Sequence, residues 1–141
     1  MKPTIIPTLR YRDAPSAIDW LCDAFGFEKH LVVDGDDGEI RHAQLTFGNG
    51  MIMLGSARDD EFGQLQAPPS STNAMVSQSP YIVVRAIDQH YRNAIEAGAE
   101  VVMPLTAEDY GGKNYSCRDP EGYLWNFGSY DPWESGDKDG A

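Results

Sequence analysis

The feature that most constrains this chain is a pattern of apolar residues that runs through one strand, one helix and three strands, and then runs a second time. A shift of 73 residues superposes the two helical stripes, placing Ile18 on Tyr91, Leu21 on Ala94 and Cys22 on Ile95. Each unit alone has one helix on one face of a small sheet, so two units side by side can bury their edges around a shared cup. The pattern therefore predicts an α+β fold of two tandem βαβββ modules whose strands form a curved, cup-like sheet.

The first module is expected over residues 1–57, with caps and turns at the junctions of its elements. Asp13 is suited to cap a helix that follows the first strand, Pro15 fits the first turn of that helix, and Gly26 ends it. The expected strands are Thr4–Arg12, Phe27–Val33, Glu39–Phe47 and Met51–Gly55.

Residues 58–78 break the pattern, because they hold two adjacent prolines and a Ser-Ser-Thr-Asn run among few apolar residues. We expect them to form a connector, or a flap over a site. A second module is expected over residues 79–133, with a helix from Asp88 to Gly98 and a type I turn at 119–122. Its expected strands are Pro80–Arg85, Glu100–Met103, Lys113–Arg118 and Tyr123–Ser129. The Gly- and Asp-rich residues 134–141 predict a flexible tail.

Composition argues against several classes of partner. The formal net charge of −11 disfavours binding to nucleic acid and to anionic membranes. The longest apolar run, Met51–Leu54, is far too short to span a bilayer, and the first residues do not resemble a signal peptide. Cys22 and Cys117 lack a C-x-x-C spacing, which is typical of reduced thiols. We therefore expect a cytoplasmic protein with no membrane or nucleic-acid partner.

Other constellations give weaker indications of a site. The histidines are His30, His42 and His90. The first two can face each other across a hairpin, but they lack a third ligand for a metal ion. The acidic turn at 34–39 does not match a calcium-binding loop, because Gly38 and Leu45 stand at ligand positions. No nucleophile motif is present, and Cys22 lies on the helical stripe, where an inert core thiol is expected.

Three stretches resemble a known family. They are Ile6–Ala14 (IPTLRYRDA), Ala24–Glu28 (AFGFE) and Arg118–Gly128 (RDPEGYLWNFG). In this order, and with the duplicated units, they are similar to the vicinal oxygen chelate superfamily, which contains glyoxalase I, extradiol dioxygenases and bleomycin-resistance proteins. The small bleomycin-resistance-like and PhnB-like members are the most similar. The resemblance covers nearly the whole chain and implies the glyoxalase/bleomycin-resistance fold.

The resemblance also implies a divalent metal ion in the cup, held by two ligands from each module, on its first and last strands. The corresponding positions here are Ile6, Met53, Ser79 and Asn126, with Tyr81 replacing Ser79 if the register slips by two. None of these residues is a usual ligand, and isoleucine and methionine exclude a hard metal ion. We therefore expect no metal and no other cofactor at this site.

Strand alternation predicts which other side chains share the wall of the cup. Starting from the positions that the resemblance implies, alternation gives these ligand-binding residues: Ile6, Thr8, Arg10, Met51, Met53, Ser79, Tyr81 and Asn126. Trp125 and Phe127 alternate out of the cup and are expected to pack under the helices. Such a wall suits a small organic molecule with one or two polar groups, but the same side chains can instead plug the cup as ordinary core.

The leading hypothesis is metal-independent binding, and so sequestration, of a small apolar or aromatic compound in the cup, as in bleomycin-resistance proteins. The alternative is a divergent metal-dependent lyase or oxidoreductase of the glyoxalase or dioxygenase type. A third possibility is a structural or regulatory module whose cup is filled by its own side chains. The resemblance also implies a homodimer. Four aromatic residues in loops or the tail could line its boundary: Phe62, Tyr110, Tyr130 and Trp133.

Overall fold

A computed structural model describes residues 2–69 and 75–134 and confirms the duplicated α+β fold. The first unit consists of β1 (Thr8–Tyr11), α1 (Ala14–Phe25), β2 (Glu28–Asp34), β3 (Ile40–Phe47) and β4 (Gly50–Ser56). The second consists of β5 (Tyr81–Val83), α2 (Ile87–Glu96), β6 (Glu100–Ala107), β7 (Lys113–Arg118) and β8 (Leu124–Gly128). Single 3-10 turns occupy Asp36–Gly38 and Phe62–Gln64.

The two units form separate four-stranded sheets with the same topology, β1-β4-β3-β2 and β5-β8-β7-β6. In each sheet the first strand runs parallel to the last, and the other pairs are antiparallel. Thr8 is paired with Met53, and Tyr81 with Asn126, so the 73-residue shift of the sequence holds in the strand register as well.

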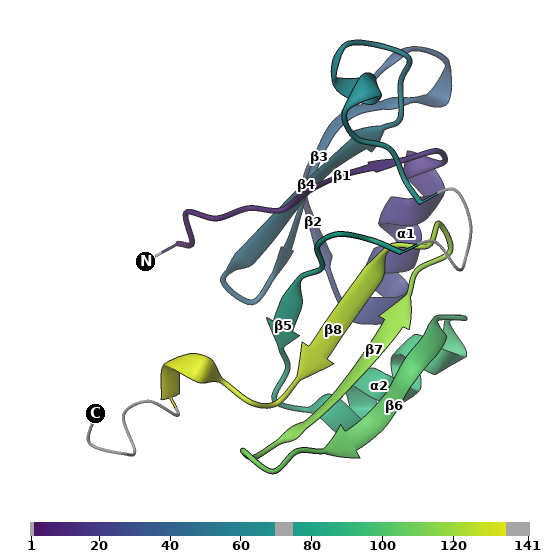
Figure 1. The fold of residues 1–141 in the computed structure, drawn as a ribbon. Helices are drawn as coiled ribbons and strands as arrows, with labels where there is room; N and C mark the ends of the chain where they lie inside the picture. The colour runs from purple at the N-terminus through teal and green to yellow at the C-terminus, as the bar shows by residue number, and fades with distance from the viewer. Residues whose placement is uncertain (1, 70–74, 135–141) are drawn as a thin grey trace.

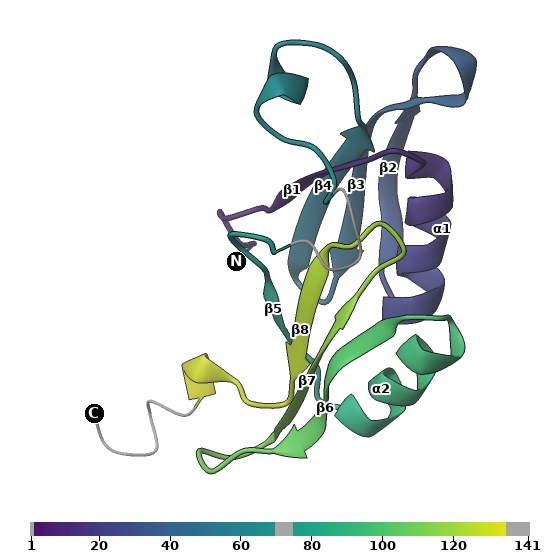
Figure 2. The ribbon, with the colours of Figure 1, turned by 45° about the vertical axis from the view of Figure 1, so that its right-hand side comes forward.

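Both helices lie on one side of the molecule and the strands on the other, as Figures 1 and 2 show. The two sheets follow one another along the long axis, and they are curved but not closed. Both ends of the described chain project on the strand side, away from the helices. Each sheet therefore has one face covered by helices and one open face.

The core between the sheets and the helices is shared by the two units. Phe25, at the end of α1, lies 4.7 Å from Phe127 and 5.5 Å from Trp125, measured between ring centroids. Trp125 and Phe127 are fully buried, as their alternation in the sequence predicts. The Trp20 indole of α1 also donates a hydrogen bond to the Ala97 carbonyl oxygen after α2, at 2.7 Å. The first helix is thus fixed to the second unit by packing and by a polar contact.

The predicted ends of α1 are confirmed. Asp13 caps the helix, with Oδ1 accepting a hydrogen bond from the Ser16 backbone N–H at 3.2 Å. Gly26 ends it in the left-handed conformation, with φ 87°, which glycine adopts without the strain that a Cβ atom would add. Among the described residues no side chain caps α2, which begins at Ile87 rather than at the predicted Asp88.

Three strands differ from the predicted bounds by more than one residue at an end, and one helix face also differs. β1 begins only at Thr8, and β5 is confined to 81–83. β6 runs to Ala107 despite Pro104, because an edge strand tolerates a residue that cannot donate to the ladder. Helix α2 buries Ile87, His90 and Ala94, whereas Ile95 is 47% exposed. Within the described residues, neither helix has the length and apolar character needed to cross a membrane.

Candidate functional site

The open face of each sheet carries the side chains that alternate away from the helices. We call Thr8, Arg10, Leu31, Gln44, Met51 and Met53 the first open face. We call Tyr81, Met103, Ser116, Leu124 and Asn126 the second open face. All of these residues are exposed or half-buried, whereas their neighbours along β4 and β8, such as Ile52 and Trp125, are buried against the helices.

Strand register places one row of four side chains across the middle of each open face. In the first the row is Thr8, Met53, Gln44 and Leu31. In the second the row is Tyr81, Asn126, Ser116 and Met103. The rows occupy equivalent places, but the first has a methionine where the second has an amide.

The first open face is apolar at its centre and is bordered by the connector. Met51 and Met53 are half-buried, as is Ile6 just before β1. The Arg10 guanidinium donates to the Ser56 carbonyl oxygen at 3.1 Å and lies 4.8 Å from the ring centroid of Phe62. Arg10 is therefore held by its own module and by the connector, which limits its freedom to reach a ligand.

The predicted pairing of His30 and His42 takes an indirect form. Gln44 lies between them, with its amide nitrogen 3.0 Å from His30 Nδ1 and its amide oxygen 2.8 Å from His42 Nε2. Because the amide oxygen can only accept, His42 donates from Nε2, and His30 accepts at Nδ1 from the amide N–H. The two imidazoles thus form a hydrogen-bonded chain through Gln44.

The second open face holds a compact polar network, and it brings the predicted residues Ser79 and Asn126 together. The Asn126 amide nitrogen donates to Ser79 Oγ at 2.8 Å and to the Pro80 carbonyl oxygen at 3.0 Å. The Asn126 amide oxygen accepts from Ser116 Oγ at 2.6 Å. These bonds fix the orientation of the amide, and within the described residues they leave the Ser79 hydroxyl proton available to a ligand.

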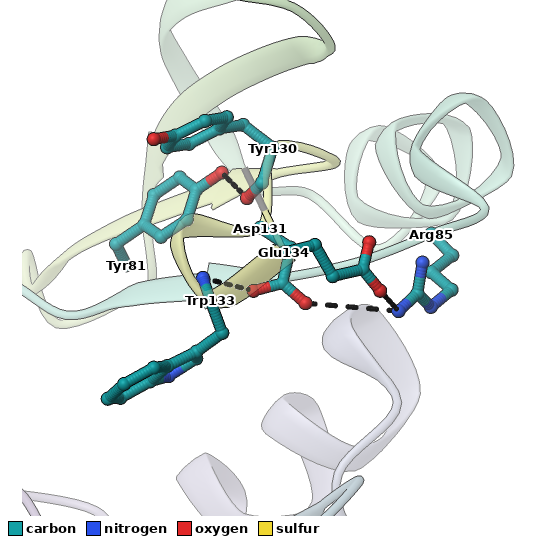
Figure 3. Close-up of polar contacts among 6 residues, drawn as sticks. All are labelled: Tyr81, Arg85, Tyr130, Asp131, Trp133 and Glu134. Carbon is teal, nitrogen blue, oxygen red and sulfur yellow. Dashed lines mark hydrogen bonds and ion pairs between the residues drawn. The ribbon is translucent and has the colours of Figure 1, made fainter. Parts of the chain in front are cut away.

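The C-terminal segment contacts Tyr81 of the second open face and carries the aromatic residues Tyr130 and Trp133 (Figure 3). The Tyr81 hydroxyl donates to the Tyr130 carbonyl oxygen at 2.7 Å. Burial, followed by the neighbouring Tyr110, Tyr130 and Asp131, raises the pKa of Tyr81, so that its hydroxyl stays protonated as a donor. Trp133 is 89% exposed, and Figure 3 shows its indole on the same side of the segment as the Tyr81 ring.

Two ion pairs with Arg85 hold this segment in place. Its guanidinium contacts the Glu134 carboxylate and, at 3.8 Å, the Asp131 carboxylate (Figure 3). Glu134 was expected to begin a flexible tail, but it is bonded to the second module; the rest of that predicted tail, 135–141, lies outside the described residues. Sequence reasoning missed this contact because Arg85 and Glu134 are far apart in the chain.

The four positions at which the family resemblance implies metal ligands do not fit a divalent metal ion. Ile6 and Met53 offer no oxygen or nitrogen in their side chains, and the only carbonyl oxygen, that of Asn126, already accepts from Ser116. Across residues 2–69 and 75–134, His, Cys, Asp and Glu side chains form no group of three that could hold a metal ion. No chemical step is therefore assigned to a metal here.

Asp119 is a buried carboxylate at the junction of the two modules, and the sequence predicts it only as part of a turn. Asp119 is 5% exposed, and its Oδ2 accepts from the Tyr11 hydroxyl at 2.6 Å and from the Trp125 indole at 3.0 Å. Its Oδ1 accepts from the backbone N–H groups of Glu121 and Tyr123 at 3.0 and 3.1 Å. Burial raises the pKa of Asp119, although these four hydrogen bonds oppose the shift. Asp119 thus joins β1 of the first module to the last hairpin of the second.

Comparison with known proteins agrees with the fold and with the resemblance. The family model of the Glyoxalase/Bleomycin resistance protein/Dioxygenase superfamily matches residues 5–127. An uncharacterized protein of Mycobacterium tuberculosis (strain ATCC 25618 / H37Rv) is 30% identical over 131 residues, which cover 91% of this chain and 75% of the relative. A related protein of Mycobacterium bovis is also 30% identical, and the match covers 84% of its length.

Solved structures are similar over most of the chain. TioX from Micromonospora sp. ML1 is 31% identical, with a TM-score of 0.70, over 89% of this chain and 97% of that one. The fosfomycin resistance protein FosX from Mesorhizobium loti, at 10% identity and a TM-score of 0.65 over 95% of this chain and 97% of its own, shares the fold alone. The chain therefore belongs to the glyoxalase/bleomycin resistance protein/dioxygenase superfamily.

Proposed function

We propose that the protein binds, and so sequesters, a small apolar or aromatic compound on its open faces without a metal ion. The observation that carries this proposal is the chemistry at the four family ligand positions, which are occupied by Ile6, Met53, Ser79 and Asn126. Two of these side chains are apolar, and the other two are hydrogen-bonded to each other. Such a surface suits apolar contact with a few orienting hydrogen bonds better than it suits metal chemistry.

The two open faces supply different parts of this binding. Met51 and Met53 offer flexible, polarizable surface that adapts to an irregular apolar ligand. Asn126, with Ser79 beside it, offers a fixed polar edge, and Tyr81 offers a ring for stacking. Apolar burial would then provide most of the affinity, and the polar network would set the orientation of the ligand.

We also propose that two copies of the chain complete the binding cup, in the cytoplasm, where both free cysteines stay reduced. Large apolar side chains remain exposed toward the strand side, including Ile5 at 87% and Trp133 in the C-terminal segment. Burying them between two copies would remove apolar surface from water. Light scattering after size exclusion should give the mass of a dimer, and Trp133→Ser should shift it toward the monomer. A monomer at all concentrations would contradict this part of the proposal.

A thermal-shift screen of chelator-treated protein tests the ligand proposal directly. We expect planar aromatic compounds or cationic aromatic peptides to raise the midpoint of unfolding, increasingly with ligand concentration. Met53→Gln should weaken the response, whereas the matched change Ile95→Gln, on the exposed side of α2, should not. An unfolding midpoint that no compound of a broad panel raises would contradict the proposal. So would stabilisation that appears only after Zn²⁺, Mn²⁺, Ni²⁺ or Fe²⁺ is added, because that result would favour a metal-dependent enzyme.

A further inference from the structure

A separate pocket lies on the helix side of the molecule, away from both open faces. It has a volume of about 280 Å³ and lies between α1 and the β7–β8 turn, which are side by side in Figures 1 and 2. The walls are mainly apolar, formed by Ala17, Trp20 and Leu21 of α1 and by Pro120 of the turn. The pocket therefore lies at the junction of the two modules.

The walls of this pocket are fixed before any ligand binds. The Trp20 indole N–H is held by the Ala97 carbonyl oxygen at 2.7 Å, and its ring packs edge-to-face on Phe25 with 5.0 Å between the centroids. Leu21 is fully buried beneath it. A ligand would thus meet a preformed apolar surface, so little conformational entropy is lost in shaping it.

The rest of the lining is polar, and it comprises Tyr11, Ser16 and the carboxylates of Asp13, Asp119 and Glu121. Hydrogen bonds hold these carboxylates in place, those of Asp119 as described above. Asp13 is held by its capping bonds to Ser16. Glu121 accepts from the backbone N–H groups of Arg12 and Asp13 at 2.6 and 2.9 Å. No lysine or arginine side chain is among the residues that line the pocket in the described part of the chain. The pocket thus combines apolar walls with fixed negative charge.

We propose that this pocket is a second binding site, for a small organic cation made of one aromatic ring and a short ammonium arm. The volume is near the lower end of the roughly 300–1,000 Å³ range of ligand pockets, which limits the occupant to about one ring. The ring would pack against Trp20 and Pro120, and the ammonium group would lie near Asp13 and Glu121. Anions are excluded by the same carboxylates.

A titration followed by ¹H–¹⁵N NMR tests this site, with phenethylammonium chloride as the probe and uncharged 2-phenylethanol as its comparator. We expect saturable shifts at residues 13–21 and 119–121, including the Trp20 indole signal. The alcohol should bind at least several-fold more weakly, because it lacks the charge. Equal affinity for the two compounds, shifts confined to the open faces, or no saturable shift would each overturn the proposal.

Two charge variants sharpen the test without removing the fold. Asp13→Asn keeps a good helix cap and removes one charge. Glu121→Gln removes a second charge, and we expect each change to weaken phenethylammonium binding by about two- to fivefold, as for exposed charge pairs. Ser16→Phe, which fills the pocket from an exposed position, should abolish binding while the circular dichroism spectrum stays unchanged. Retained binding in Ser16→Phe would count against the pocket.

Variants on the open faces and in the pocket distinguish this site, which does not depend on the proposed function, from the binding proposed for the open faces. Met53→Asn, on the first open face, should leave the affinity for phenethylammonium unchanged. Glu121→Gln should likewise leave unchanged the affinity for a compound bound on the open faces. If Met53→Asn weakened phenethylammonium binding as much as Glu121→Gln does, the cation would belong to the open faces and the second site would be wrong.

Discussion

The two modules share a fold but carry different side chains on their open faces. On the helix-covered face both sheets are apolar, and their first and last strands are paired in the same register. On the open face Thr8 and Met53 in one module correspond to Tyr81 and Asn126 in the other. The covered face is constrained by packing, so we infer that the chemistry of the open faces reflects what they bind.

A second difference lies on the covered side of the helices. The 73-residue shift places Ala17 of α1 on His90 of α2, and both are buried. His90 Nε2 donates to the Phe25 carbonyl oxygen at 2.8 Å, so its Nδ1 accepts from the Tyr115 hydroxyl at 2.7 Å. The second module therefore has a buried polar group that the first replaces with a methyl group, and the end of α1 docks on it.

The largest expected effect is on the free energy of unfolding, and it comes from Asp119 in the β7–β8 turn of the second module. Asp119→Ala would remove the acceptor from the Tyr11 hydroxyl, the Trp125 indole and two backbone N–H groups. We expect the free energy of unfolding to fall by about 3 kcal/mol or more, because buried donors lose their partner. Asn49→Ala, in the corresponding exposed turn of the first module, should change it by about 0.5 kcal/mol or less. Urea denaturation measures both, and equal effects would contradict the asymmetry between the turns.

His90 should make the stability of the protein depend on pH. Burial lowers the pKa of His90 in the folded protein, so below about 6.5 the unfolded chain binds a proton that the folded chain does not. The free energy of unfolding should therefore fall as the pH drops below about 6.5, by at most about 1.4 kcal/mol per pH unit. His90→Gln should flatten this slope between pH 7.5 and 5.5. An unchanged slope in His90→Gln would show that another group titrates.

Exchanging one position between the open faces tests whether their chemistry matters for binding. Met53→Asn gives the first face the amide that the second has at Asn126, and it removes apolar contact area. We expect the affinity for a compound found in the thermal screen to fall about fivefold, or about 1 kcal/mol, with little change in the unfolding midpoint. Isothermal titration measures this change. An equal loss of affinity in Ile95→Gln would indicate a non-specific effect.

The smallest effect is expected at the C-terminal segment, which follows β8 as the connector follows β4. Arg85→Ala removes the ion pairs to Asp131 and Glu134, and such pairs contribute little to stability because the Arg85 side chain is 73% exposed. The unfolding midpoint should hardly change, but the heteronuclear NOE of the Trp133 indole should fall as the segment gains motion. Arg92→Ala on α2 is the control. An unchanged NOE in Arg85→Ala would show that the segment is held by its other contacts.

Much of the fold could be predicted because local signals agree with it. Asp13 and Gly26 mark the ends of α1 by capping chemistry, and the 73-residue repeat indicates the duplicated units. The buried face of α2 was predicted less well. A polar residue such as His90 is expected in solvent, and its burial depends on two hydrogen-bond partners, Tyr115 and Phe25, that the sequence does not show. Ile95 was assigned to that face as an apolar residue but lies mainly in solvent.

The site was harder to predict than the fold. Strand alternation was enough to place Met53 and Asn126 on the open faces. It could not show that Arg10 is held by Ser56 and Phe62, nor that Asp119 joins the modules, because those contacts link segments that are distant in sequence. Side-chain direction follows from local geometry, whereas hydrogen-bond partners follow from tertiary packing.

The central claim is that the open faces bind their ligand without a metal ion. Isothermal titration of the strongest compound from the thermal screen, with chelator-treated protein and again with excess Mn²⁺, Zn²⁺, Ni²⁺ or Fe²⁺, tests it most directly. We expect the same dissociation constant in every case, and a loss of affinity in Met53→Asn. Binding that occurs only with a metal ion present, at one ion per chain, would contradict it.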